Sequence, residues 1–172
     1  MRYLLILGAT LSFLQANITN IDSFQAHFTQ TIIDDKKKEL HYKGDVLAKK
    51  PQNALWRYTT PVNKQVFINS RVVTIVEPEL EQAIVKDIES NFNFFQLLKD
   101  AKEIDANHYV TFYKETKFTI VTNKNGIVES INYKDEFENN VIIKFQNQII
   151  NKQIATENFI PNLPLDYDII RD

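Results

Sequence analysis

The feature that most constrains the fold is a succession of short β-type runs that begins near residue 38. These runs are rich in Val, Ile, Thr, Tyr and Phe, and polar or turn residues separate them. Apolar and polar residues alternate within them, which is the period of a half-buried strand. Strands are expected at 38–49, 54–60, 65–69, 72–77, 81–88, 108–114, 117–122, 127–134, 141–146 and 149–154. Their regular spacing favours an antiparallel sheet that closes toward a barrel.

Turn residues lie where such a sheet needs them. Asn125 and Gly126 tolerate the positive φ values of a tight hairpin turn, so they predict a hairpin between two of the runs. Pro51 and Pro61 flank the run at 54–60, and because proline cannot donate to a strand ladder, both are expected at strand ends. No linker or repeat divides the chain, so a single domain is expected.

A helix is expected before the first strand, over residues 18–33. Its apolar residues recur at intervals of three and four, which is the stripe of an amphipathic helix. They are Ile18, Ile21, Phe24, Phe28 and Ile32.

A second helix is expected at 91–100, where the β pattern is interrupted and Ser90 is placed to cap the helix. Phe94, Phe95, Leu97 and Leu98 make one side of this short segment strongly apolar. The segment could plug the end of a barrel or form a lid over a cavity, and the pattern alone leaves both open.

The first sixteen residues have the layout of a secretory signal peptide. Arg2 precedes an apolar stretch at 3–14, and the sequence turns polar at Asn17. The stretch is too short to cross a hydrocarbon core of roughly 30 Å. We therefore expect 1–16 to be a signal peptide and 17–172 to be a single exported domain; a buried first element is the alternative.

Composition argues against several classes of function. The chain has 20 basic and 22 acidic residues, so it has no broad basic field for nucleic acid. It contains no cysteine, so disulfides, thiolate metal sites and an acylated N-terminal cysteine are not expected. Its three histidines are not spaced as metal ligands are. Its three glycines are too far apart to form a phosphate-binding loop. We expect no enzyme, catalytic residue, metal or cofactor, although a triad assembled across the fold remains open.

Large apolar side chains are abundant, with twelve phenylalanines, seven tyrosines and Trp56. A small barrel can fill its interior with such residues or leave a cavity for an apolar ligand. Composition cannot choose between these two possibilities.

An ordered set of motifs resembles the LolA family of periplasmic outer-membrane lipoprotein carriers. The motifs are SFQAHFTQ at 23–30, YKGDV at 42–46, KKP at 49–51, WRY at 56–58 and VEPELEQA at 76–83. The segment 94–98 then falls where the family has a lid helix. The resemblance is close up to about residue 98 and continues mainly as a strand pattern.

The resemblance implies a mainly β protein with some helix, an incomplete (unclosed) antiparallel β-barrel with a helical lid over an apolar cavity. It implies a monomer in the periplasm that receives lipoproteins from an inner-membrane, ATP-driven release complex. The carrier shields their acyl chains and delivers them to an outer-membrane acceptor, which is a protein or the membrane itself. Lys50 stands where the family has an arginine that contacts the lid.

The residues expected to contact acyl chains are apolar ones from the strands and the lid. They are Phe24, Phe28, Trp56, Tyr58, Phe67, Ile84, Phe94, Leu97, Leu98, Phe112 and Ile131. Three other functions remain as alternatives: a lipid-sensing module of related fold, a lipocalin-like binder of free lipids, and a hydrolase.

Overall fold

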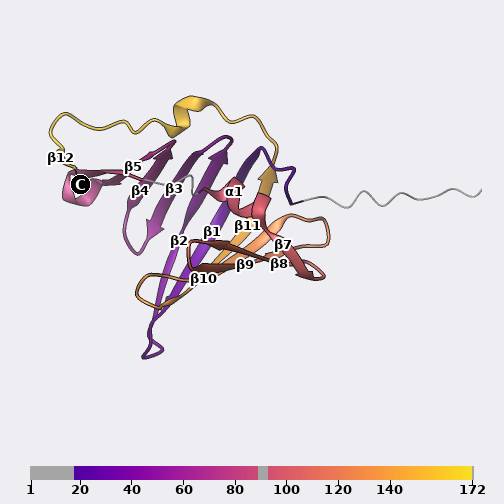
Figure 1. Cartoon of the computed structure of the whole chain (residues 1–172). Coiled ribbons are helices and arrows are strands. Elements are labelled where there is room, and N and C mark those ends of the chain that lie inside the picture. The colour runs from indigo at the N-terminus through magenta and orange to yellow at the C-terminus, as the bar shows by residue number, and fades with distance from the viewer. Residues whose placement is uncertain (1–17, 89–92, 172) are drawn as a thin grey trace, which may run out of the picture.

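In the computed structural model, residues 18–88 and 93–171 are described. Their strands form a single twelve-stranded sheet in the order β12-β6-β5-β4-β3-β2-β1-β11-β10-β9-β8-β7 (Figure 1). Neighbouring strands are antiparallel, apart from the parallel pair β12 and β6. The sheet ends at β12 on one side and β7 on the other, so the barrel is unclosed, as expected. The expected signal peptide and Ser90 lie outside the described residues.

The strands are β1 (Ser23–Ile33), β2 (Glu39–Lys49), β3 (Asn53–Thr60), β4 (Lys64–Asn69), β5 (Val72–Glu77), β6 (Gln82–Asp87), β7 (Lys102–Asp105), β8 (His108–Tyr113), β9 (Thr116–Thr122), β10 (Val128–Lys134), β11 (Asn140–Ile150) and β12 (Asp168–Arg171). The α-helix among the described residues is α1 (Phe94–Asp100). Two 3-10 turns complete the elements, η1 (Pro78–Leu80) and η2 (Thr156–Phe159).

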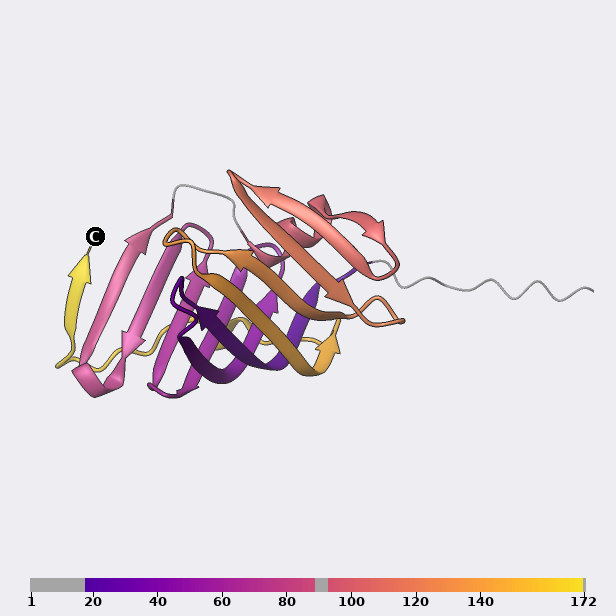
Figure 2. The ribbon, with the colours of Figure 1, turned by 90° about the horizontal axis from the view of Figure 1, so that it is seen from below.

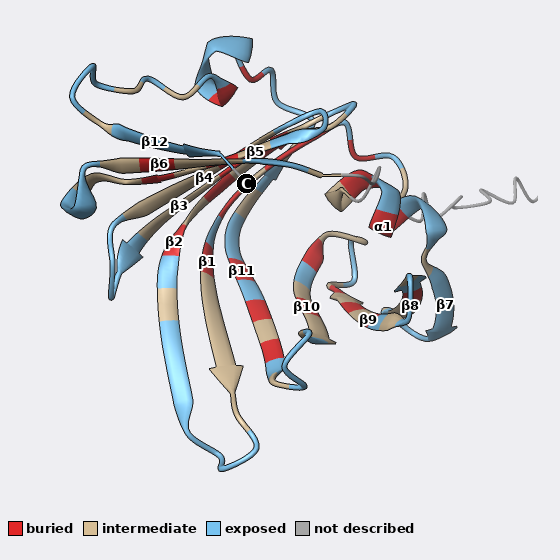
Figure 3. Cartoon of the chain, turned by 60° about the vertical axis from the view of Figure 1, so that its left-hand side comes forward, coloured by how far each residue is buried: buried red, intermediate tan, exposed pale blue. Residues whose placement is uncertain are grey.

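The sheet is strongly curved, and β7–β10 turn back toward β2–β4 (Figure 2). Side chains from both parts, together with α1, enclose one hollow on the concave side. Buried residues run along the central strands β1, β2 and β11, whereas the far end of the β1–β2 hairpin is exposed (Figure 3). The concave side therefore holds the main core.

The main core joins the central strands to α1. Phe24 and Phe28 from β1 are almost fully buried there, and Phe145 comes from β11. The ring of Phe24 lies 5.1 Å from that of Phe145 in an edge-to-face arrangement, which is favourable for aromatic pairs. From α1, Leu98 is also fully buried in this core.

A second core lies on the convex side of the sheet, where residues 151–167 form a C-terminal strap. Leu55 and Phe67 face this side from β3 and β4. The strap covers them with Ile154 and with Phe159 of η2, which is 0% exposed. Lys49 also donates from Nζ to the backbone carbonyl of Ile154 at 2.8 Å. The strap therefore gives the sheet a buried layer on its outer face.

The helix expected over 18–33 is wrong, because this region contains strand β1. Phe24, Phe28 and Ile32 are four residues apart, and that spacing fits one helix face and one strand face equally well. Ala26, midway between Phe24 and Phe28, is also buried, and burial at every second residue is the pattern of a strand. Pairing with β2 on one side and β11 on the other satisfies the backbone of this segment.

The other expected strands are present with small changes at their ends. The exception is 149–154: only Ile149 and Ile150 are in a strand, where β11 (Asn140–Ile150) continues beyond the expected 141–146 after a polar break, and 151–154 begin the C-terminal strap. Asn147 has φ 53° at this break, and the pairing with β1 shifts register opposite it, so a β-bulge explains the polar gap. The turn at Gly126 is confirmed, with φ 72°. The exposed strands β7 and β12 were not expected.

Candidate functional site

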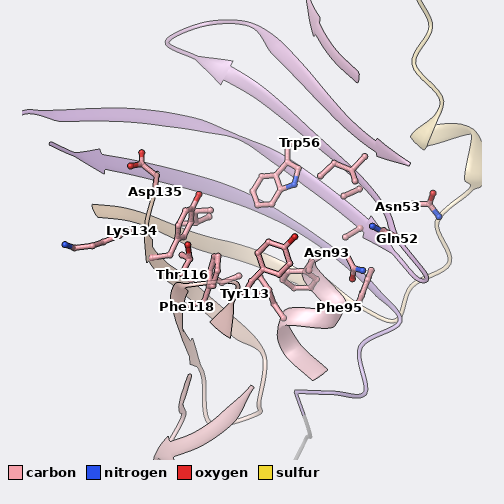
Figure 4. A pocket seen from close by; sticks show the side chains of 18 of the residues that line it. Gln52, Asn53, Trp56, Asn93, Phe95, Tyr113, Thr116, Phe118, Lys134 and Asp135 are labelled. Carbon is pink, nitrogen blue, oxygen red and sulfur yellow. The ribbon is translucent and has the colours of Figure 1, made fainter. Parts of the chain in front are cut away.

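The candidate site is a cavity of about 470 Å³ on the concave side of the sheet. Its size falls within the range of roughly 300–1,000 Å³ for small-molecule sites. Trp56 lies on one wall, Tyr113 and Phe118 lie across from it, and α1 covers one end (Figure 4). Ile131 and Ile143 extend the apolar lining along β10 and β11. The wall is thus mainly hydrocarbon and aromatic.

One glycine shapes the aromatic wall. Gly44 pairs with Phe28 on β1 and with Tyr58 on β3. A Cβ atom at Gly44 would meet the Phe28 ring at 2.9 Å, so only glycine lets that ring lie across β2. Phe28 then makes edge-to-face contacts with Trp56 and Tyr58, with ring centroids 4.9 and 5.1 Å apart. The YKGDV motif therefore has a structural role at the cavity wall.

The lid helix α1 is short and begins at a clear cap. Asn93 has extended backbone angles, and its side chain accepts a hydrogen bond from the backbone N–H of Gln96 at 2.9 Å. The next residue, Phe94, lies 4.9 Å from Phe24 between ring centroids and lines the cavity. Asn93 thus performs the capping function expected for Ser90.

Lys50 lies close to the lid helix α1. Its Nζ atom is 5.9 Å from the centroid of the Phe95 ring, within reach of a cation–π contact. The same atom forms an ion pair with Asp22 at 2.7 Å, and both side chains are well exposed. Such a pair contributes little to stability, at most about 1 kcal/mol. Lys50 therefore contacts the lid without a strong bond to it.

Four of the predicted contact residues line the cavity: Trp56, Phe94, Leu97 and Ile131. Phe24 lines a small adjoining hollow with Trp56 and Phe94.

Three more predicted residues support the cavity from the main core. Phe28 and Leu98 are buried there, and Tyr58 packs against it. These residues stand behind the cavity wall.

The structure places the remaining three predicted residues elsewhere. Phe67 faces the convex side in the second core, and Phe112 is 64% exposed on the outside of β8. Ile84 lies on the same face of the sheet as Trp56, because cross-strand partners in β3 to β6 connect the two residues. However, it lies three strands away from Trp56. Successive residues of a strand point to opposite faces of the sheet. The sequence did not determine which of the two faces Phe67 and Phe112 occupy.

Several lining residues were not predicted, chiefly Tyr113, Phe118 and Tyr133 on β8–β10. Phe118 and Ile120 alternate with Lys117 and Thr119, so the period-two pattern could have indicated their inward side. Gln52 was also missed, because it lies in the β2–β3 turn, where period arguments do not apply.

The cavity wall is uncharged at neutral pH except at one end. Burial raises the pKa of Tyr58 to about 12 and also raises the pKa of Tyr133, with the nearby carboxylate of Asp135 as a further cause for the latter. Charged side chains gather at the end away from α1, where Lys134, Asp135 and Glu136 line the opening. The centre therefore suits a neutral apolar ligand.

Other chemistry has little support among the described residues. No group of three or more His, Asp or Glu side chains within residues 18–88 and 93–171 is placed to hold a metal ion. The helices in those ranges also do not include one that is long and apolar enough to span a membrane. What the site offers is a partly open, mostly apolar cavity.

Comparison with known proteins decides the family. The profile of the family described as "Outer membrane lipoprotein carrier protein LolA" matches residues 19–162. The chain belongs to the LolA family.

Relatives across the whole domain carry the same description. An outer-membrane lipoprotein carrier protein from Campylobacter jejuni is 41% identical over 152 residues, covering 88% of each chain. One from Wolinella succinogenes is 33% identical over 156 residues, covering 91% of each. Both the family and these relatives are thus described as carriers.

The fold agrees with this assignment. A solved LolA superfamily protein from Nitrosomonas europaea superimposes with a TM-score of 0.53 at 12% identity, covering 86% of this chain and 94% of the other. At so low an identity the likeness concerns the fold alone. It supports the reading of an open β-barrel with a helical lid.

Proposed function

We propose that this protein carries outer-membrane-directed lipoproteins and holds their acyl chains in the cavity under α1. The observation that carries the proposal is the apolar cavity between β2–β4, β8–β11 and α1, in a chain whose relatives are named lipoprotein carriers. A lipid chain needs a neutral hydrocarbon surface, and Trp56, Phe118 and Ile131 supply one.

The energy of lipid transfer explains why a carrier is needed. Each acyl CH₂ moved into water costs about 0.8 kcal/mol, so a triacyl anchor costs on the order of 30 kcal/mol. A bare lipoprotein therefore cannot leave a membrane at a useful rate. An apolar cavity removes most of this cost, and the energy for extraction comes from an ATP-driven complex in the inner membrane.

The proposed setting is the periplasm, after removal of residues 1–16 as a signal peptide, with residues 17–172 as one carrier domain. The protein acts as a monomer between the release complex and an outer-membrane acceptor, which is a protein or the membrane itself. The exposed ion pair of Lys50 suits a lid that has to open at both ends of this route.

The lid is the part of the cavity best placed to move. α1 has only seven residues, and its buried side chains are Phe95, Leu97 and Leu98. A helix this short is not stable alone in water, so its position depends on these three contacts. For acyl chains to enter, the packing contacts of these three side chains must break. The acyl chains then replace those contacts and keep the apolar side of the helix away from water.

A release assay with a matched pair of lid variants tests the proposal. Spheroplasts making a radiolabelled outer-membrane lipoprotein are incubated with the purified mature protein, which is then pulled down from the soluble fraction. We expect a one-to-one soluble complex. Leu97→Asp places a carboxylate in the cavity wall and should abolish its recovery, whereas Lys99→Asp on the exposed side of α1 should not.

Circular dichroism before the assay ensures that both variants are folded. If the lipoprotein stays in the membrane while the wild-type protein still binds free lipid, the carrier function is wrong. The protein is then a lipid-binding or lipid-sensing module of related fold.

A further inference from the structure

The cavity under α1 is small for the anchor that it is proposed to hold. Its volume of about 470 Å³ lies in the lower half of the range for sites that take one drug-sized molecule. The transfer cost of a triacyl anchor corresponds to about 40 CH₂ groups, which is more hydrocarbon than such a molecule contains. The lipid therefore needs apolar surface beyond the cavity.

A row of apolar side chains leads out of the cavity across the sheet. It begins at Trp56 on the cavity wall, and each following residue is the cross-strand partner of the one before. The partners are Val66 on β4, Ile75 on β5, Ile84 on β6 and Ile170 on β12. Cross-strand partners share one face of a sheet, so all five lie on the concave side with Trp56. These five residues form the concave row.

The concave row is partly exposed beyond Trp56. Val66, Ile75 and Ile84 are half-buried, and Ile170 is 46% exposed. Neither of the two apolar cores that the described residues form includes any of these four side chains. The strap covers the other face of the same strands (Figure 3). The row is therefore an accessible apolar surface.

Polar side chains border the concave row on one side. Glu77, Gln82 and Asp168 are cross-strand partners on β5, β6 and β12, and Gln82 donates from Nε2 to Oε2 of Glu77 at 2.5 Å. On the other side, Ile68 pairs with Val73, and Ile68 also lines the cavity. The row thus has one polar edge and a second apolar connection to the cavity.

The concave row is long enough for one acyl chain. Neighbouring strands lie about 4.8 Å apart, so the four steps from β3 to β12 span roughly 19 Å. One leaflet takes half of a hydrocarbon core of roughly 30 Å, so an acyl chain in it spans about 15 Å. A chain can therefore lie along the row with one side against the sheet.

Resting on the proposed carrier function, the continuity of the two surfaces identifies the occupant. A molecule with several hydrocarbon chains joined at one head can fill the cavity and the row together, because Trp56 belongs to both. The residues beyond Trp56 are aliphatic and have no hydrogen-bonding side chain, which suits hydrocarbon. We propose that the concave row binds one acyl chain of the lipoprotein outside the cavity, while the cavity under α1 holds the rest of the anchor.

Lipopeptides with one or three acyl chains test the proposal. Both have the same short peptide, whose N-terminal cysteine carries either one palmitoyl chain or three. Trp56 is the only tryptophan and lines the cavity, so its fluorescence reports binding of both.

Ile84→Asp places a carboxylate in the concave row. Each CH₂ kept from water corresponds to about fourfold in affinity, so the loss of two such contacts lowers affinity for the three-chain lipopeptide more than about tenfold. Affinity for the one-chain lipopeptide should stay within about twofold of wild type, because a single chain fits the more enclosed cavity.

Ile104→Asp is the matched control, because Ile104 is 65% exposed on β7 at the other end of the sheet. It should bind both lipopeptides as the wild-type protein does. Circular dichroism establishes that each variant is folded. If Ile84→Asp does not fold, Ile170→Asp at the exposed end of the row takes its place, and it should lower affinity for the three-chain lipopeptide alone, by about fourfold.

Three-chain affinity within about twofold of wild type in the folded row variant would overturn this inference. The cavity would then widen to take every chain, and the carrier function would stand. An equal loss for both lipopeptides would also overturn it, because the substitution would then act on the cavity itself. If the wild-type protein binds neither lipopeptide, the proposed function fails, and the inference fails with it.

Discussion

Replacement of Gly44 by alanine should unfold the β2–β3 pairing that forms the cavity wall. An added Cβ atom would lie 1.8 Å from the backbone carbonyl oxygen of Arg57 and 2.9 Å from Cε1 of Phe28. The first distance is more than an ångström too short, and the obstacle is backbone, which cannot rotate away. The β2–β3 register already shifts at this point, between Lys43 and Gly44. Relief therefore requires that the two strands separate locally.

The magnitude follows from the kind of clash. Overpacked cores lose about 1–3 kcal/mol when side chains can adjust, and a clash against backbone belongs at the upper end, about 3 kcal/mol or more. For a domain of this size each kcal/mol lowers the melting temperature by roughly 2–4 °C. Gly44→Ala should therefore melt roughly 6–12 °C below wild type in a circular dichroism scan. Displacement of Phe28 should also change the fluorescence of Trp56, which it contacts.

The other glycine among the described residues provides the control. Gly126 lies in a turn at φ 72°, where alanine is strained by about 1–2 kcal/mol without touching the cavity. Gly126→Ala should lower the melting temperature by roughly 2–8 °C and leave Trp56 fluorescence unchanged. If Gly44→Ala melts within about 2 °C of wild type, β2 and β3 are not packed as closely at Gly44 as described.

Three further predictions concern the second core, the tyrosine behind the wall and the lid contact. Phe159→Ala should cost about 3–5 kcal/mol in urea unfolding, because this ring is fully buried under the strap, and lipid affinity of the folded protein should stay the same. Tyr58 has a pKa near 10 when unfolded and about 12 when folded, so its contribution to stability is complete below pH 10 and is lost as the pH rises toward 12. Between pH 9 and pH 11 the urea midpoint should therefore fall less in Tyr58→Phe than in wild type. An equal fall in both proteins would contradict the burial of Tyr58. Lys50→Ala should change stability by less than about 1 kcal/mol, because its ion pair with Asp22 is exposed; a larger loss would mean that Lys50 anchors the lid strongly.

Much of the fold could be predicted from alternation along the chain, because a half-buried strand repeats every two residues. The rule failed in β1, where Phe24, Phe28 and Ile32 are four residues apart. That spacing fits one face of a helix as well as one face of a strand. Short exposed strands such as β7 and β12 bury no regular face, so their sequences lack a signal. The cover of the convex side by the strap depends on contacts distant in sequence, and Phe159 alone could not indicate it.

The cavity was predictable in kind but only partly in its residues. The lid segment and Trp56 were identified because motifs fix them, and both line the cavity. Phe67 and Phe112 were misplaced because a strand offers two faces and a one-residue error exchanges them. Gln52 had no sequence signal, because it lies in the β2–β3 turn, outside the alternation of the strands.

Photocrosslinking from two adjacent residues of β8 tests whether acyl chains occupy the cavity. Tyr113 lines the cavity, and its neighbour Phe112 points to the outside of the same strand. Each is replaced in turn by p-benzoyl-phenylalanine, and the protein is loaded with a lipoprotein whose acyl chains carry a radiolabel. If the cavity holds the chains, irradiation crosslinks the label from position 113 and not from position 112. Equal labelling from both positions, or labelling from 112 alone, would show that the acyl chains bind somewhere else.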